Sequence, residues 1–291
     1  MKRADFLQLT ISLLACSALL AAQNSPKTTS MRPPPILNVF REYVKAGNTE
    51  ITESYNAIEQ EAVRTCVRLH CPNSYFAAES HEPDGRPAWW FSMFDSPAEV
   101  DRAAGIYAQN AELHAAMARI LESKKDLVWS PENTLAKYRA DLSRDSGVDF
   151  PHAIWLTVTV IKVRDGRLAE FAELQKQINR AAAERGSERA GTRPSGLVYQ
   201  GMAAADAQTF FIILPQRNLP KRQRDGAASG ADPSEAAAAA AIERLAAEAI
   251  TSSATTSPAI RPDFSCVSRE WIAADPDFWA PAGIYIPLDA R

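Results

Sequence analysis

A strand-like apolar run leads into a glycine turn, followed by a helical pattern, at two places in the chain. The first unit is 35–47, PILNVFREYVKAG, and the second is 153–166, AIWLTVTVIKVRDG. Alternating apolar positions indicate strands, and spacings of three and four, as at Ile51, Tyr55 and Ile58, indicate an amphipathic helix. The two turn glycines are 166 − 47 = 119 residues apart. This spacing favours one architecture that occurs twice.

The residues between the two units complete the first pattern. A helix is expected over 49–69, and two strand-like runs surround a turn of hairpin composition at 82–86. The next helix starts at a capping box, residues 96–99, SPAE. With a last extended segment near 134–139, the first half has the order β-α-β-β-α-β, which is typical of a ferredoxin-like unit.

The second half follows the same order, with an insertion in the charged loop 217–231. We therefore predict an α+β fold of two tandem ferredoxin-like β-α-β-β-α-β repeats that form an internal pseudo-dimer. The predicted parts are a signal peptide at 1–22, a linker at 23–35, a first repeat at 36–148, and a second repeat with a C-terminal tail at 149–291.

The first 22 residues have the character of an export signal. Lys2 and Arg3 precede an apolar run, which is the arrangement of a secretory leader. The sequence LLAC that ends at Cys16 resembles a bacterial lipobox, so this cysteine is a candidate for lipidation. Ordinary cleavage near Ala21 or Ala22 is the alternative. We expect an exported protein that is periplasmic, secreted or envelope-anchored, and that meets a membrane only through a lipid anchor.

Composition narrows the choice of partners. The chain has 291 residues, 46% of them hydrophobic, and a formal net charge of −3. It is long enough for two modest domains. Because it carries no excess of positive charge, nucleic acid is not expected as a partner.

The cysteines present two alternatives. Cys66 and Cys71 are five residues apart and could form a disulfide in an oxidising compartment, or they could stay as buried thiols. Cys266 is left over. His70 lies between the first two, but a structural zinc site needs four ligands at a recognisable spacing. We expect no metal.

Several segments resemble the dimeric α/β-barrel superfamily, whose ferredoxin-like domains pair their sheets. They are the strand Val39-Phe40-Arg41, the turn Lys45-Ala46-Gly47, the strand Trp89-Trp90-Phe91, and the second copy of the pattern. The strand-turn-helix opening is similar to that of NIPSNAP-type and antibiotic-biosynthesis-monooxygenase-type domains. The resemblance covers about residues 36–272, and it implies a space between two paired sheets.

That implied space is the candidate ligand site. If helices cover Leu37 and Val39, the opposite faces of the first strands of each half turn into the space. An apolar pocket with few polar groups is a usual ligand site, although plain core packing has the same composition. The candidate ligand-binding residues are Asn38, Phe40, Trp90, Trp155, Thr157 and Thr159.

The resemblance also implies two activities, cofactor-free monooxygenation and haem degradation. The haem-degrading members use a strand asparagine with a tryptophan and a histidine. Asn38 and Trp89 or Trp90 match the first two, but the family motif is not evident around His114. We expect no cofactor.

No catalytic residue stands out. Glu79 and His81 alternate on one strand face and could act as an acid–base pair, although exposed polar residues are also expected beside a hairpin. The chain contains no nucleophile elbow, zinc-protease, Walker or dinucleotide motif.

Three functional hypotheses remain. The first is an exported module that binds a small apolar ligand or a protein partner. The second is a cofactor-independent monooxygenase or isomerase that acts in the inter-sheet pocket. The third is a structural envelope protein.

Overall fold

The structure, a computed structural model, describes residues 31–45, 49–80, 85–144, 147–185, 196–218 and 233–280. The predicted leader with Cys16, most of the predicted linker, and His81 lie outside these residues, so export stays a prediction. Within the described ranges, no helix has both the length and the apolar character that crossing a membrane requires.

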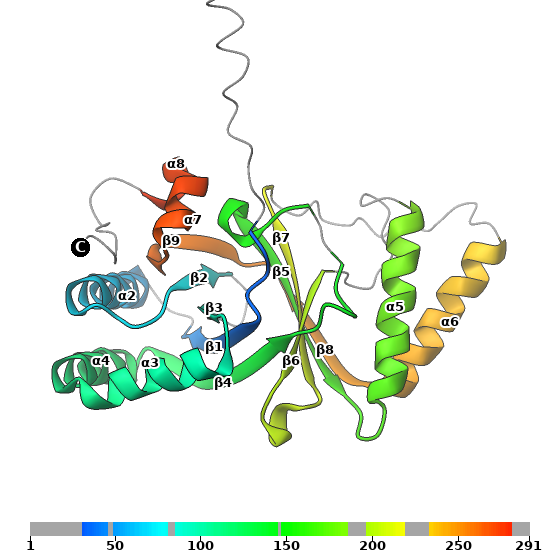
Figure 1. Ribbon diagram of the computed structural model, residues 1–291, viewed down its shortest axis with the longest axis horizontal. Coiled ribbons are helices and arrows are strands. Elements are labelled where there is room, and N and C mark those ends of the chain that lie inside the picture. Colours follow the sequence, from blue (N-terminus) through cyan, green and yellow to red (C-terminus); the bar gives the residue numbers. More distant parts are fainter. Residues whose placement is uncertain are drawn as a thin grey trace, which may run out of the picture. The chain divides into compact units, whose positions relative to one another are not determined.

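The described strands form one antiparallel sheet that closes on itself (Figure 1). The nine strands have the order β7-β6-β4-β1-β3-β2-β9-β5-β8, and β7 also pairs with β5, so all strands except β8 close an eight-stranded barrel. Their bounds are β1 Ile36–Val44, β2 Tyr75–Glu79, β3 Arg86–Phe94, β4 Val128–Tyr138, β5 Trp155–Val163, β6 Leu197–Gly201, β7 Thr209–Gln216, β8 Ile250–Thr256 and β9 Ala259–Cys266.

The single barrel shows that the prediction of two tandem ferredoxin-like repeats forming a pseudo-dimer is wrong. β4 pairs with β1 on one edge and, through residues 136–138, with β6 on the other, and β9 pairs with both β2 and β5. Strands from both parts of the chain therefore share one hydrogen-bonded sheet and one interior. An alternating pattern predicts where strands lie but not which edges join, and closing the barrel leaves few unpaired strand edges.

Helices cover the outside of the barrel in two groups (Figure 1). α2, α3 and α4 lie on one side, and α5 and α6 lie on the other. Two short helices follow β9, and short 3-10 turns precede β5 and β7. The bounds are α2 Thr49–Leu69, α3 Pro97–Gln109, α4 Ala111–Lys124, η1 Phe150–His152, α5 Leu168–Arg185, η3 Ala204–Asp206, α6 Pro233–Ala249, α7 Arg269–Ala274 and α8 Pro276–Trp279.

Local hydrogen bonds fix the ends of α3 and α4. The Ser96 Oγ accepts from the Glu99 backbone N–H at 3.2 Å, which is one half of the predicted capping box, and the Glu99 carboxylate accepts from the N–H of Asp95, one residue before the cap, at 2.7 Å. Asn110 ends α3, and its side chain caps α4 by accepting from the Leu113 N–H at 3.0 Å. The helical stretch therefore breaks at Asn110.

The strand faces are the reverse of those predicted. Leu37 and Val39 of β1, and Leu156 and Val158 of β5, belong to the interior cluster of the barrel rather than to the contacts beneath the helices. Both faces of these strands carry apolar residues, so alternation could not decide which face turns inward. A small barrel has to be filled by large side chains. The interior here is filled by Phe76, Trp89, Phe91, Tyr199, Phe211 and Ile260, among others.

Candidate functional site

An open cleft of about 920 Å³ lies at the end of the barrel where β1 and β2 begin and β3 and β4 end. Its floor is apolar and includes Met93, Tyr138, Phe150 and Trp271. All four belong to the barrel interior cluster or pack against it. The cleft therefore opens directly onto the upper layer of the core.

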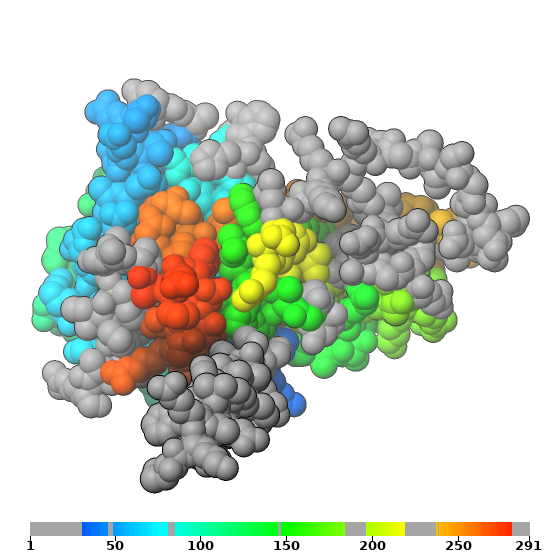
Figure 2. All heavy atoms as spheres, turned by 90° about the horizontal axis from the view of Figure 1, so that it is seen from above, coloured from blue at the N-terminus to red at the C-terminus, as the bar shows by residue number. Residues whose placement is uncertain are grey.

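Two buried tryptophans close this end of the barrel. The Trp271 ring lies 5.3 Å from that of Phe76 and 6.5 Å from that of Phe150, and the Trp279 indole N–H donates to the Pro151 carbonyl at 2.7 Å. In Figure 2 the red C-terminal helices lie beside the green segment that contains η1. Trp271 and Trp279 are only 5% and 2% exposed.

Part of the predicted linker forms a wall of the cleft. The Tyr138 N–H donates to the Pro35 carbonyl at 2.8 Å, and the Tyr199 hydroxyl donates to the Pro34 carbonyl at 3.2 Å. The Met31 N–H donates to the Asp149 carboxylate at 2.7 Å. Residues 31–35 therefore belong to the folded unit and are not a free tether, because these bonds tie an extended proline-rich segment to the barrel.

The rim of the cleft is acidic. Its charged lining residues in the described chain are Asp95, Glu99 and Glu270 against Arg32. A hydrogen bond from the Ser268 side chain lowers the pKa of the Glu270 carboxyl. The rim therefore favours a neutral or cationic polar group on a bound molecule.

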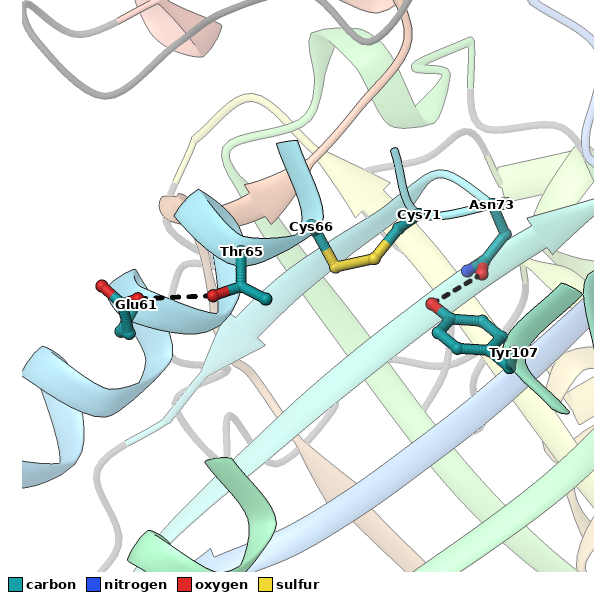
Figure 3. Close-up of a disulfide and its surroundings, with 6 residues drawn as sticks. All are labelled: Glu61, Thr65, Cys66, Cys71, Asn73 and Tyr107. Carbon is teal, nitrogen blue, oxygen red and sulfur yellow. Dashed lines mark hydrogen bonds between the residues drawn. A yellow bond between two sulfur atoms is a disulfide. The ribbon is translucent and has the colours of Figure 1, made fainter. Parts of the chain in front are cut away.

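A disulfide stiffens one corner of the cleft (Figure 3). Cys66 and Cys71 are bonded with a Cα–Cα distance of 4.7 Å, so the pairing considered from the sequence is present. The Tyr107 hydroxyl also donates to the Asn73 side chain at 3.3 Å, which ties α3 to the start of β2. Cys266 packs in the same buried cluster, and burial raises its pKa to about 12, so its thiol stays protonated.

An aspartate–histidine pair lies behind the cleft wall. Asp149 precedes η1, and its carboxylate contacts His152 Nδ1 and accepts from the His152 backbone N–H. The His152 Nε2 is buried and has no hydrogen-bond partner in the described part of the chain. The intervening residues, Phe150 and Pro151, line the cleft. No sequence motif marked this pair. Asp149 caps the short helical turn η1, and an aspartate in that position is too common to indicate a functional site.

The predicted ligand residues do not gather in one pocket. Asn38, Phe40 and Trp90 lie on the sheet face opposite Leu37 and Val39, where the Lys124 Nζ of α4 lies 4.9 Å from the Trp90 ring centre and 5.7 Å from that of Phe40.

The remaining three predicted residues lie on the outer face of β5. Thr159 and Thr255 join their hydroxyls at 2.9 Å, and Gln216 donates to Thr157 at 3.3 Å. Trp155 is two residues before Thr157 in the same strand, so its side chain lies on the same face as the two threonines. Leu156 lies on the opposite face, toward the barrel interior. The predicted inter-sheet site is thus not formed by these six residues, because the barrel turns their faces outward.

A buried ionic cluster lies between β1 and the helices α2 and α4. The Lys124 ammonium bonds to Glu42 at 2.8 Å and to Glu59 at 3.0 Å, and the Tyr55 hydroxyl donates to Glu42 at 3.1 Å. Burial opposes the charge on Lys124, but Glu59 and Glu42 outweigh it, so the pKa of the lysine lies above its ordinary value. Burial also raises the pKa of Glu59, and Lys124 only partly opposes this.

Replacing Glu59 with glutamine should reduce the dependence of stability on pH. Because the folded pKa of Glu59 is raised, its contribution is fully present at low pH and is lost as the pH rises from about 4.5 through the folded value. Glutamine does not titrate, and its amide oxygen can still accept from Lys124. In urea unfolding between about pH 4 and about pH 8, the free energy of unfolding should therefore change less for Glu59→Gln than for the original chain.

The control for this experiment is Glu61→Gln, because the side chain of Glu61 is 56% exposed on the same helix. This variant should keep the original pH dependence. Identical pH profiles for the original chain and Glu59→Gln would contradict a raised pKa at Glu59.

Glu79 and His114 do not have the roles considered for them. Glu79 is buried, and its carboxylate accepts from Arg86 Nε at 2.9 Å and from Arg261 at 2.6 Å, so it is a structural ion-pair residue and not a free base. His114 is exposed on α4, and Trp89 is enclosed in the barrel. The haem-type combination of asparagine, tryptophan and histidine is therefore not assembled around Trp89.

No protein-family model matches the chain, and no curated protein sequence does. Among solved structures, it is similar to an anthrone oxidase-like protein with 13% identity and a TM-score of 0.49, over 78% of this chain and 92% of that one. It is also similar to a "putative monooxygenase" from Fusobacterium nucleatum, with 15% identity, 79% and 94% coverage and a TM-score of 0.47. A third is chlorite dismutase from Candidatus Nitrospira defluvii, with 7% identity, 80% and 93% coverage and a TM-score of 0.40.

The resemblance of the sequence to the dimeric α/β-barrel superfamily stays a prediction, because these likenesses are too distant to test it. A specific likeness to NIPSNAP-type domains is not shown. Identities of 15% or less and TM-scores below 0.5 carry no argument about activity.

Proposed function

We propose that the chain binds a small, largely apolar molecule in the cleft at the end of the barrel. The cleft carries this proposal, because its volume of about 920 Å³ lies within the usual range for ligand sites, about 300–1,000 Å³. Its apolar floor suits the body of such a molecule. Its acidic rim suits a neutral or cationic polar group at the outer end.

The walls of the cleft support binding because contacts within the chain hold them in place. The Cys66–Cys71 disulfide fixes one corner, the Trp279 bond to Pro151 fixes another, and residues 31–35 are tied to β4 and β6. A preformed site loses little conformational entropy on binding, so more of the contact energy appears as affinity.

Binding should be blocked by filling the cleft from its exposed edge. Ala140 lines the cleft and is exposed, so Ala140→Trp adds an indole there without disturbing the core. With 2-naphthylmethylammonium as the probe, isothermal titration should show one site in the original chain and at least about tenfold weaker binding in Ala140→Trp. The matched control is Ala115→Trp on the exposed face of α4, which should bind as the original chain does. Equal affinity in both variants would overturn the proposal.

The second candidate function is cofactor-independent oxygenation or isomerisation of such a molecule. The observation that favours it is the Asp149–His152 pair, because both reactions begin when a base removes a proton from carbon, and an oriented imidazole is a suitable base. The pair lies behind the cleft wall, so the reacting carbon has to pass Phe150 and Pro151 to reach the imidazole. In the oxygenation, a CH2 group and dioxygen would give a carbonyl group and water. In the isomerisation, the proton would return at another carbon.

The enzymatic candidate is tested by exchange of a substrate proton. Incubated in deuterated water with an anthrone-type ketone, the chain should speed deuterium uptake at the acidic carbon, and His152→Gln should abolish this acceleration. Asp149→Asn should reduce it, because the imidazole would lose its orienting carboxylate. No acceleration by the original chain, with probe binding retained, would remove the enzymatic candidate and leave the binding function.

A further inference from the structure

The end of the barrel opposite the cleft carries a continuous row of flat side chains. The Arg41 guanidinium lies 5.0 Å from the Trp89 ring centre and 5.3 Å from that of Tyr43, and Tyr43 stacks on Trp129 at 4.6 Å. Arg41 pairs across the sheet with Trp89, which belongs to the barrel interior. The row therefore runs from the interior, at Trp89, to the surface, at Trp129.

Two hydrogen-bond donors in this row have no acceptor. The Arg41 Nε and the Trp89 Nε1 are buried, and neither has a hydrogen-bond partner in the described chain. Trp89 is only 1% exposed. The Arg41 Nη2 does bond to Glu132, at 2.6 Å, but this bond leaves the Nε donor unmet. Buried donors are almost always hydrogen-bonded, and a buried donor without an acceptor costs free energy. An acceptor that reached these two N–H groups would therefore be bound favourably.

A bulge in β4 shapes the outer end of the row. Arg41 lies opposite Glu132 and Tyr43 lies opposite Trp129, so two residues of β4 face the single intervening residue of β1. One of those two, Ser130, has a φ of 50°, in the left-handed region that costs a non-glycine residue energy. Trp129 nevertheless remains 46% exposed at this bulge. Bulges re-aim side chains and are frequent beside functional sites.

We propose that this end of the barrel binds an aromatic carboxylate. The two unpaired donors supply hydrogen bonds but no acceptors, and one belongs to a guanidinium, so a carboxylate oxygen is the complementary group. The exposed Trp129 ring, stacked on Tyr43, offers a flat apolar surface to the ring of the ligand. This preference is opposite in charge to that of the acidic cleft, so the two sites select different molecules.

Two tryptophan variants test the proposal on the full chain. The probe is 2-naphthoate, with 2-naphthylmethylammonium as the ring-matched cation, and the readout is isothermal titration. Trp89→Phe removes the N–H but keeps a ring, and should weaken 2-naphthoate binding about three- to tenfold. Trp129→Ala removes the exposed ring, and should weaken it about tenfold. Because Trp129 is on the surface, this second variant stays informative even if Trp89→Phe disturbs the core.

The control is Trp90→Phe, because Trp90 neighbours Trp89 in β3 but faces the helices, and it should bind 2-naphthoate normally. Ala140→Trp, which fills the cleft, should also leave 2-naphthoate binding unchanged. Unaltered affinity in both Trp89→Phe and Trp129→Ala would overturn the proposal, as would loss of 2-naphthoate binding in Ala140→Trp. The original chain should also bind 2-naphthoate more tightly than 2-naphthylmethylammonium at this site. The opposite preference would count against the proposal.

Discussion

Replacing Lys124 with methionine is expected to lower the free energy of unfolding by about 3–5 kcal/mol, because breaking a buried ion pair leaves uncompensated charge. Lys124 is 6% exposed, and its ammonium is the cation that Glu42 and Glu59 share. Methionine fills similar space but provides no charge and no N–H donor. The two carboxyl groups would then lie close together in a buried place, and within the described residues Tyr55 would be the remaining side-chain donor to Glu42.

Urea unfolding at neutral pH measures this loss, and Lys125→Met is the matched control. Lys125 is the next residue, and its ion pair with Glu122 is exposed, so its loss should cost about 1 kcal/mol or less. The cost of Lys124→Met should shrink as the pH falls toward about 4.5, because the raised pKa of Glu59 lets that carboxyl take up a proton, and it then no longer needs the cation. Similar costs for the two variants would contradict a buried, shared ammonium.

Replacing Trp271 with alanine should cost about 3–5 kcal/mol of unfolding free energy, because it leaves a cavity in the packed end of the barrel. Trp271 is 5% exposed, and its ring contacts those of Phe76, Phe150 and Trp279. The same change enlarges the cleft, of which Trp271 is part. It should therefore also weaken binding of 2-naphthylmethylammonium.

Thermal and urea unfolding give the stability cost of Trp271→Ala, and Trp129→Ala is its control. Trp129 is 46% exposed and has one stacking partner, so its truncation should cost about 1 kcal/mol. An equal cost for the two variants would show that α7 does not close the barrel in solution. Retained probe affinity in a folded Trp271→Ala would show that the probe does not use this part of the floor.

The positions of many helices and strands could be predicted from the sequence, but the way in which the strands pair could not. The helix expected at 49–69 is α2, Thr49–Leu69, and the first strand is β1, Ile36–Val44. Period and capping are local properties, so local reading finds them. The inward direction of Leu37 and Val39, and the joining of β4 to β6, depend on which edges pair across the whole chain. No local pattern contains that information.

The candidate site shows the same limit. Cys66 and Cys71 are five residues apart, and that short separation allowed the sequence to suggest their pairing. The cleft floor instead combines Met93, Phe150 and Trp271 from three distant segments, and Lys124 bonds to a glutamate 82 residues away. Each of these residues alone has an ordinary sequence context. Only the closed barrel brings them together.

The position of β9 has a consequence for how the chain folds during synthesis. Residues 259–266 pair with β2 on one side and meet β5 at Trp155 on the other, so one edge of β2 stays unpaired until β9 has been made. A ribosome-bound chain that has emerged only to residue 250 carries β2 with one edge unpaired. Exposed strand edges invite pairing with other chains. Translation of β9 is thus the step that covers this edge of β2, and termination before β9 leaves the edge open to other chains.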